Sequence, residues 1–203
     1  GVIQYDLGKA SQNGQFQRKG QLNAPPEKLL GVIPEMRRLY MDKRKPDLLA
    51  KHLQRLDDME DYQRPSLDHL YTAKYLHLGE NNCDHCDFPS LVDRPVRSNH
   101  RAFSVHYGTI ASGNFVLKDA KMRDLYASDP ELNILCFEME AAGLMNNIPC
   151  LVIRGICDYC DSHKNDAWHK YAALTAAAYA RELLLVLRSQ RVNSMPPLEL
   201  QQG

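Results

Sequence analysis

Acidic side chains follow two short apolar segments in the second half of this sequence. Glu138 and Glu140 come directly after Ile134–Phe137, and Asp158 comes directly after Leu151–Cys157. Continuous apolar runs bounded by polar residues are typical of strands buried in a parallel sheet. The carboxyl ends of parallel strands share one edge of a sheet, and open α/β sheets bind ligands there. The spacing therefore predicts several carboxylates at a small-molecule site.

The two glutamates have two interpretations. A carboxylate in a crevice only accepts hydrogen bonds and so suits the two hydroxyls of a sugar diol. Alternatively, both Glu138 and Glu140 serve the N-terminus of the next helix, where negative charge is favoured. Residues two positions apart do not share a face of a helix. Spacing alone favours the helix interpretation.

Asp158 is expected to be partly desolvated, which would raise its pKa towards use as a general acid. The alternative is an aspartate that caps the next segment or pairs with Arg154. Gly155, inside the expected strand, predicts close approach of a backbone or a ligand. Ser112 and Gly113 end an earlier strand pattern and form either a tight turn or a wall of the same pocket.

A single C-x-x-C motif, Cys83 to Cys86, has two interpretations as well. With His77 or His100 it would approach a zinc site, which needs four ligands. Otherwise the two cysteines are free thiols in a loop. The predicted site contains no metal. If the chain does bind a metal, the Cys83–Cys86 pair is the candidate for binding it. The sequence has no P-loop, no dinucleotide-binding glycine motif and no serine-hydrolase elbow.

Helix and strand patterns alternate along the chain, which predicts an α/β fold. Residues 9–26 are expected to be a loop, and residues 58–101 a loop-rich insertion. Pro34 is expected to kink or split the first helix. Residues 189–203 are predicted to be a flexible tail. The expected strands are 2–7, 102–112, 134–137 and 151–157, and the expected helices are 27–40, 47–57, 119–127 and 166–188, with a short helix between the last two strands.

The composition excludes several classes of protein. The 203 residues include 25 Lys and Arg and 25 Asp and Glu, so the chain lacks the positive field that nucleic-acid or anionic-membrane binding requires. No apolar run is long enough to span a membrane, and the first residues do not form a secretory signal. The six cysteines are therefore expected to be free thiols, and the chain to be cytoplasmic. Because it opens on Gly1, it is expected to be a fragment or an excised domain.

The segment FEMEAAGLMNNIPCLVIRGICDYCD closely resembles the C-terminal motifs of the nucleoside phosphorylase/nucleosidase superfamily, which includes methylthioadenosine/S-adenosylhomocysteine nucleosidases. IASGN resembles an upstream motif of that family. GVIQYDLGK, the Asn-Ala-Pro-Pro segment and DSHKN resemble the phosphorylase-like domain of fungal multidomain proteins. The resemblance covers residues 1–188. It implies a three-layer α/β/α fold, of which this chain holds the C-terminal portion.

The resemblance also implies roles for individual residues. Asp158 would protonate or hydrogen-bond purine N7, and Glu140 would bind the ribose hydroxyls. Met139 would pack on the sugar, and Glu138 would be a further polar wall. The remaining pocket positions implied are Val116 and Leu117, which line the base, beside Ser112 and Gly113.

Three departures from the family bear on activity. Cys157 replaces the usual serine, so a hydrogen bond to the acid is expected to be missing or weaker. Val116 replaces an aromatic residue, which puts base stacking in doubt. The family's N-terminal half, with its glycine-rich segment and phosphate- or water-binding groups, is expected to be absent.

The expected function is cleavage of the N-glycosidic bond of a purine nucleoside or nucleotide by phosphorolysis or hydrolysis. No cofactor is expected, although phosphate would be a co-substrate of a phosphorylase. The alternative is a catalytically incomplete nucleoside-binding or sensor and effector module of a larger protein. Expected partners are a nucleoside or nucleotide, further copies of the chain, and downstream NACHT, ankyrin or tetratricopeptide modules.

Overall fold

The computed structural model describes residues 1–12, 16–79, 82–95 and 101–187. It combines helices with a three-stranded parallel sheet and a separate two-stranded hairpin, which confirms the expected α/β class. The predicted tail, residues 189–203, lies outside the described residues. Among the described residues, no helix combines the length and the apolar character that crossing a membrane would require.

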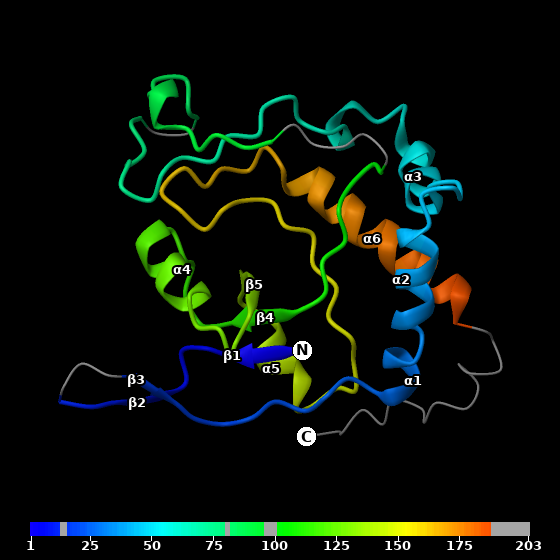
Figure 1. Cartoon of the computed structure of the whole chain (residues 1–203), viewed down its shortest axis with the longest axis horizontal. Coiled ribbons are helices and arrows are strands. Elements are labelled where there is room, and N and C mark those ends of the chain that lie inside the picture. Colours follow the sequence, from blue (N-terminus) through cyan, green and yellow to red (C-terminus); the bar gives the residue numbers. More distant parts are fainter. Residues whose placement is uncertain (13–15, 80–81, 96–100, 188–203) are drawn as a thin grey trace.

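The central sheet has three parallel strands in the order β1 (Val2–Gln4), β4 (Thr109–Ser112) and β5 (Ile134–Glu138). In register, Gln4 lies beside Ser112, and Ser112 lies beside Glu138. The β4 and β5 strands therefore end at the same edge (Figure 1). The expected strand 102–112 is thus confined to its last four residues.

Leu151–Cys157 is not a strand, and this corrects the sequence prediction. The segment contributes to the wall of a cavity that Leu135 and Cys136 of β5 also line. An apolar run becomes a strand only when a neighbour completes its ladder hydrogen bonds. The described residues provide no such neighbour for this segment.

The expected loop 9–26 contains a hairpin instead of lacking regular structure. Strands β2 (Gly8–Ala10) and β3 (Phe16–Arg18) pair antiparallel. All of their residues are exposed. A strand is predicted from alternating apolar and polar residues, and a hairpin without a buried face does not show that pattern.

Pro34 divides the first helical pattern, as predicted, and stands in the first turn of the second piece. Aspartate N-caps begin two further helices, since Asp47 and Asp119 each accept two backbone N–H groups. The α-helices are α1 (Glu27–Leu30), α2 (Ile33–Met41), α3 (Leu48–Leu53), α4 (Ala120–Ala127), α5 (Ala141–Met145) and α6 (His169–Val186), and the 3-10 helices are η1 (Gln54–Leu56), η2 (Glu60–Tyr62) and η3 (Phe88–Ser90).

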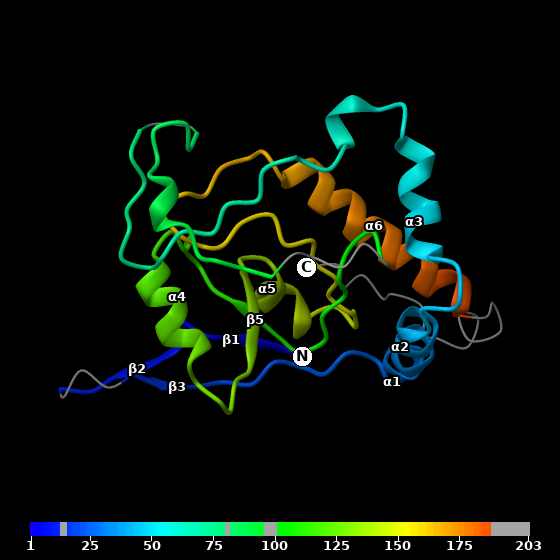
Figure 2. The same ribbon diagram turned by 45° about the horizontal axis from the view of Figure 1, so that its top comes forward.

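Two separate apolar clusters hold the chain together. One lies between α2, α3 and α6 and is centred on Val32, Met36 and Leu183. The other packs Tyr5 and Ala111 with residues of β5 and α4. Figures 1 and 2 show these groups at opposite ends of the molecule. The segments between them form the site described next.

Candidate functional site

Hydrogen bonds join the end of β4 to the turn that follows β5. The Gly113 N–H donates to the Glu138 carbonyl at 3.1 Å, and the Ala142 N–H donates to Ser112 Oγ at 2.9 Å. A side chain at Gly113 would place its Cβ 2.5 Å from the Tyr5 ring, so this position requires glycine. Ser112 is fully buried. These residues therefore build the turn from which α5 starts.

The two glutamates of this turn have different surroundings. Glu138 is buried, and its Oε2 accepts the N–H groups of Glu140 and Ala141, both at 3.0 Å. It therefore serves the N-terminus of α5. Its Oε1 is buried and has no hydrogen-bond partner in the described part of the chain. Glu140 is mostly exposed and forms an ion pair with Arg154 at 3.1 Å. Glu138 thus has the role of binding the N-terminus of the next helix. Glu140 does not have this role, and its side chain remains accessible to a ligand.

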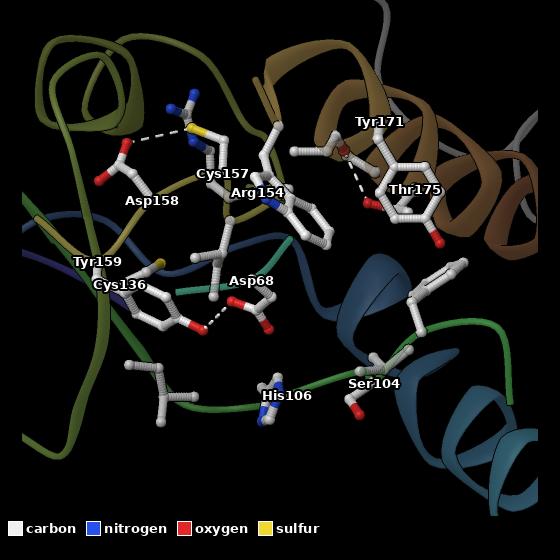
Figure 3. A pocket seen from close by; sticks show the side chains of 18 of the residues that line it. Asp68, Ser104, His106, Cys136, Arg154, Cys157, Asp158, Tyr159, Tyr171 and Thr175 are labelled. Atoms are coloured by element: carbon white, nitrogen blue, oxygen red, sulfur yellow. Dashed lines mark hydrogen bonds between the residues drawn. The ribbon is translucent and has the colours of Figure 1, made fainter. Parts of the chain in front are cut away.

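A cavity of about 1840 Å³ opens between the sheet, α6 and the insertion. Leu135 and Cys136 form part of its sheet side, and Tyr171 and Thr175 of α6 form part of another wall. Figure 3 shows side chains of these elements around it. The lining is more apolar than polar, which is the usual character of a ligand pocket. The cavity is larger than the roughly 300–1,000 Å³ of typical pockets.

Asp158 lines this cavity, where Figure 3 shows it beside Cys157, and it is held by three donors. Its Oδ1 accepts the Cys160 N–H at 2.8 Å, and its Oδ2 lies 3.0 Å from Lys164 Nζ. Cys157 donates its thiol to Oδ2 at 3.3 Å, so the supporting hydrogen bond that was expected to be missing or weaker is present, from a sulfur donor.

The pKa of Asp158 is lowered, which is the opposite of the expectation. Burial acts to raise this pKa, but the hydrogen bonds from Cys160, Lys164 and Cys157 outweigh it. Asp158 is therefore an ionised carboxylate at neutral pH. Lys164 forms the ion pair with Asp158. Arg154, which the sequence had suggested as the partner of Asp158, pairs with Glu140 instead.

A consequence for stability follows from the lowered pKa. Since the folded-state pKa lies below the unfolded value of about 3.9, ionised Asp158 stabilises the fold above that pH, and the contribution is lost as pH falls through the folded pKa. We expect the difference in unfolding free energy between the wild type and Asp158→Asn to narrow as pH falls below about 4. Urea unfolding between about pH 3 and pH 7 measures it. A difference that does not change over this range would contradict the ionised pairing.

A close approach at Gly155 was predicted, and the structure confirms it. The neighbour is the backbone of another segment. A Cβ at this position would lie 1.9 Å from the carbonyl oxygen of Ala172 in α6. The segment that leads to Asp158 therefore packs directly on the helix.

The remaining predicted residues lie outside the cavity wall. The wall includes Asp158 and Arg154 but not Val116, Leu117, Met139 or Glu140. Leu117 is buried, whereas Val116 and Met139 are about half exposed. Glu140 reaches the wall only through its ion pair with Arg154.

The sequence prediction missed a polar group from the insertion. Tyr159 donates its hydroxyl to Asp68 at 2.7 Å, and Arg94 contacts the same hydroxyl at 2.6 Å. Burial, followed by the bond to Asp68, raises the pKa of Tyr159. All three line the cavity. They are far apart in the sequence, so only the polar composition of residues 58–101 could have drawn attention to them.

Comparison with known proteins finds two kinds of relative. A protein from Hyaloscypha variabilis named nucleotide-binding leucine-rich repeat (NLR)-like protein is 40% identical over 195 residues, which is 95% of this chain and 19% of that protein. A protein from Escherichia coli named ATP nucleosidase Cap17 is 34% identical over 85 residues, which is 39% of this chain and 17% of that protein.

The chain thus spans less than a fifth of the length of the curated relatives that it matches. No protein-family model matches the chain, and no solved structure matches it. The shared sequence is similar to part of an NLR-like protein and, over a shorter stretch, to part of a nucleosidase.

Proposed function

We propose that this chain contributes to a nucleosidase-like site that cleaves the N-glycosidic bond of a purine nucleoside or nucleotide. The observation that carries the proposal is Asp158, an ionised carboxylate held by three donors in the wall of a large, mostly apolar cavity. The similarity to a protein named ATP nucleosidase supports this reaction and points to adenine nucleotides as substrates.

In this reaction, the bond between the sugar and the base breaks, and its electrons go to the base. A proton on N7 makes the base a better leaving group. The lowered pKa of Asp158 argues against a stored proton on its carboxyl. We therefore assign Asp158 the role of accepting a hydrogen bond from N7–H, whose proton comes from solvent, while the electrons of the breaking bond move onto the base and water or phosphate bonds to the sugar carbon.

Glu140 is the proposed ligand of the sugar. Its carboxylate is exposed, and Arg154 holds one of its oxygens. A carboxylate fixed in this way can accept hydrogen bonds from both hydroxyls of a diol. Arg154 is four residues before Asp158 and lines the cavity with it. The ion pair thus brings the sugar ligand to the segment that carries the base ligand.

The other residues near the turn are assigned supporting roles. Met139 would pack on the sugar, and Val116 and Leu117 would contact the base. Ser112 and Gly113 hold the turn in place, and the free Oε1 of Glu138 offers a further acceptor. Phosphate is a co-substrate only if the reaction is a phosphorolysis.

The second candidate function is a nucleotide-sensing or effector module of a longer protein. The match to the NLR-like protein favours it, because that match includes nearly all of this chain and a small part of a much longer protein. In that case the cavity binds a nucleotide without breaking its glycosidic bond.

One experiment separates the two functions. The purified protein is incubated with adenosine, inosine or ATP, with and without phosphate, and free base is quantified by chromatography. Base release supports cleavage, and dependence on phosphate identifies phosphorolysis. Saturable binding by calorimetry without base release supports the sensing module. If there is neither release nor binding, both proposals are wrong.

A further inference from the structure

A group of metal-ligating side chains lies in the insertion, and one of them, Cys83, lines the same cavity as Asp158. The ligand atoms of His77, Cys83 and Cys86 all lie within 4.8 Å of one another. They belong to two turns of the chain, five residues separating the histidine from the C-x-x-C motif. Tetrahedral zinc is commonly bound by two cysteines of this spacing together with histidines. Three of the four ligands that such a site needs are therefore together.

The surroundings orient His77 for this role. Its Nε2 lies 2.7 Å from the Asn82 carbonyl oxygen. A carbonyl only accepts, so Nε2 carries the proton and Nδ1 has the free lone pair. Metal-binding histidines usually donate their other N–H to such an acceptor. The hydrogen bond thus leaves Nδ1 as the nitrogen that is able to bind a metal ion.

A second observation points to the same place. The His163 side chain is only 5% exposed, and both of its ring nitrogens are buried without a hydrogen-bond partner in the described part of the chain. Its ring stacks on Tyr71 at 4.1 Å between centroids and meets the His77 ring edge to face at 5.4 Å. Buried polar atoms without a hydrogen-bond partner destabilise a fold, so such atoms require an explanation.

We propose that His77, Cys83 and Cys86 bind one zinc ion and that His163 completes the site. The imidazole of His163 meets the ring of His77, one of the three grouped ligands, and a change in its side-chain torsions would be needed to bring a nitrogen to the ion. A metal bond satisfies one of its nitrogens, and Asp161, whose carboxylate lies 3.7 Å from Nδ1, is placed to hold the other.

The two thiols lie close enough together to bind one ion. Both would give up their protons on binding a divalent cation. The alternative, two free thiols, explains neither the buried nitrogens of His163 nor the orientation of His77.

The position of the site gives it a structural purpose. It joins the insertion to the segment that follows Asp158, which His163 and Lys164 belong to. The neighbouring contacts are single hydrogen bonds, such as His77 N–H to Ser162 Oγ at 3.0 Å and Trp168 Nε1 to the Leu67 carbonyl at 3.0 Å. A zinc ion would fix this junction far more firmly than these bonds, because structural zinc sites contribute directly to folding.

Metal content and cobalt substitution test the proposal. Protein purified without a histidine tag is expected to hold about one zinc per chain by elemental analysis. Cobalt in its place should give the visible bands of a tetrahedral ion and a thiolate charge-transfer band. Cys83→Ser should lose both, whereas Cys150→Ser, a matched change at a cysteine outside the group, should keep both. His163→Gln should weaken zinc affinity by about tenfold or more.

Several results would overturn the proposal. One is metal-free protein that takes up no zinc when reduced and equilibrated with the ion. Another is equal zinc binding by the wild type and Cys83→Ser. Wild-type affinity in His163→Gln would show that His163 is not the fourth ligand. Cobalt spectra of the wild type keep the test decisive if a variant does not fold.

Discussion

Asp158→Asn is expected to lower base release by about 10²- to 10⁴-fold while nucleotide binding persists. Asparagine keeps the size of the side chain but has no negative charge to stabilise a proton on the departing base. Its amide also presents a donor where Lys164 and Cys157 already donate. The rate of base release is measured by chromatography, and the affinity by calorimetry with ATP.

The matched control is Asp61→Asn. Asp61 is 75% exposed at its side chain and pairs only with Lys170 on the surface among the described residues. This change should leave the rate within about twofold, because exposed ion pairs contribute little. If Asp158→Asn releases base as fast as wild type, Asp158 does not have the role proposed for it.

Gly155→Ala is expected to unfold the chain or destabilise it by more than about 3 kcal/mol. The added Cβ would lie 1.9 Å from the Ala172 carbonyl oxygen and 2.4 Å from its carbon. These are backbone atoms of α6, so no side chain can move to make room. Relief requires the segment and the helix to separate. Urea unfolding and the recovery of soluble protein measure the effect.

Gly143→Ala provides the opposite control. Gly143 lies inside α5, and nothing lies within 4 Å of where its Cβ would be. Alanine at this position should stabilise the chain by about 0.4–1 kcal/mol, because it reduces the freedom of the unfolded chain and favours a helix. Equal stability of the two variants would mean that Gly155 and Ala172 are not packed together in solution.

The sequence allowed the α/β class and the strand β5 to be predicted because these depend on local patterns. The predicted edge, shared by 134–137 and 151–157, is instead formed by β4 and β5. The apolar run of β5 and the helical pattern that follows it are each formed by residues adjacent in the sequence. Leu151–Cys157 shows where local patterns fail. Its composition is that of a strand, but a strand requires a hydrogen-bonding neighbour, and composition says nothing about whether one is present.

The site was predictable to the same extent. The turn that carries Glu138 and Glu140 follows from chain order. The pairing of Asp158 with Lys164 does not, since Lys164 reaches back across a loop. The bond from Cys157 comes from a thiol, a weak donor, which agrees with the expected weaker hydrogen bond. The lowered pKa depends on those donors. Contacts such as Asp68 with Tyr159 join residues separated by 91 positions, which no spacing rule brings together.

The two ion pairs, Glu140 with Arg154 and Asp158 with Lys164, each sum to zero charge. Beyond about 8–10 Å, where salt screens isolated charges, each pair therefore produces almost no field. These four side chains neither attract a triphosphate from a distance nor repel it. Any difference in the rate at which an uncharged nucleoside and a highly charged nucleotide approach the cavity would therefore come from other charged residues of its wall, such as Arg94.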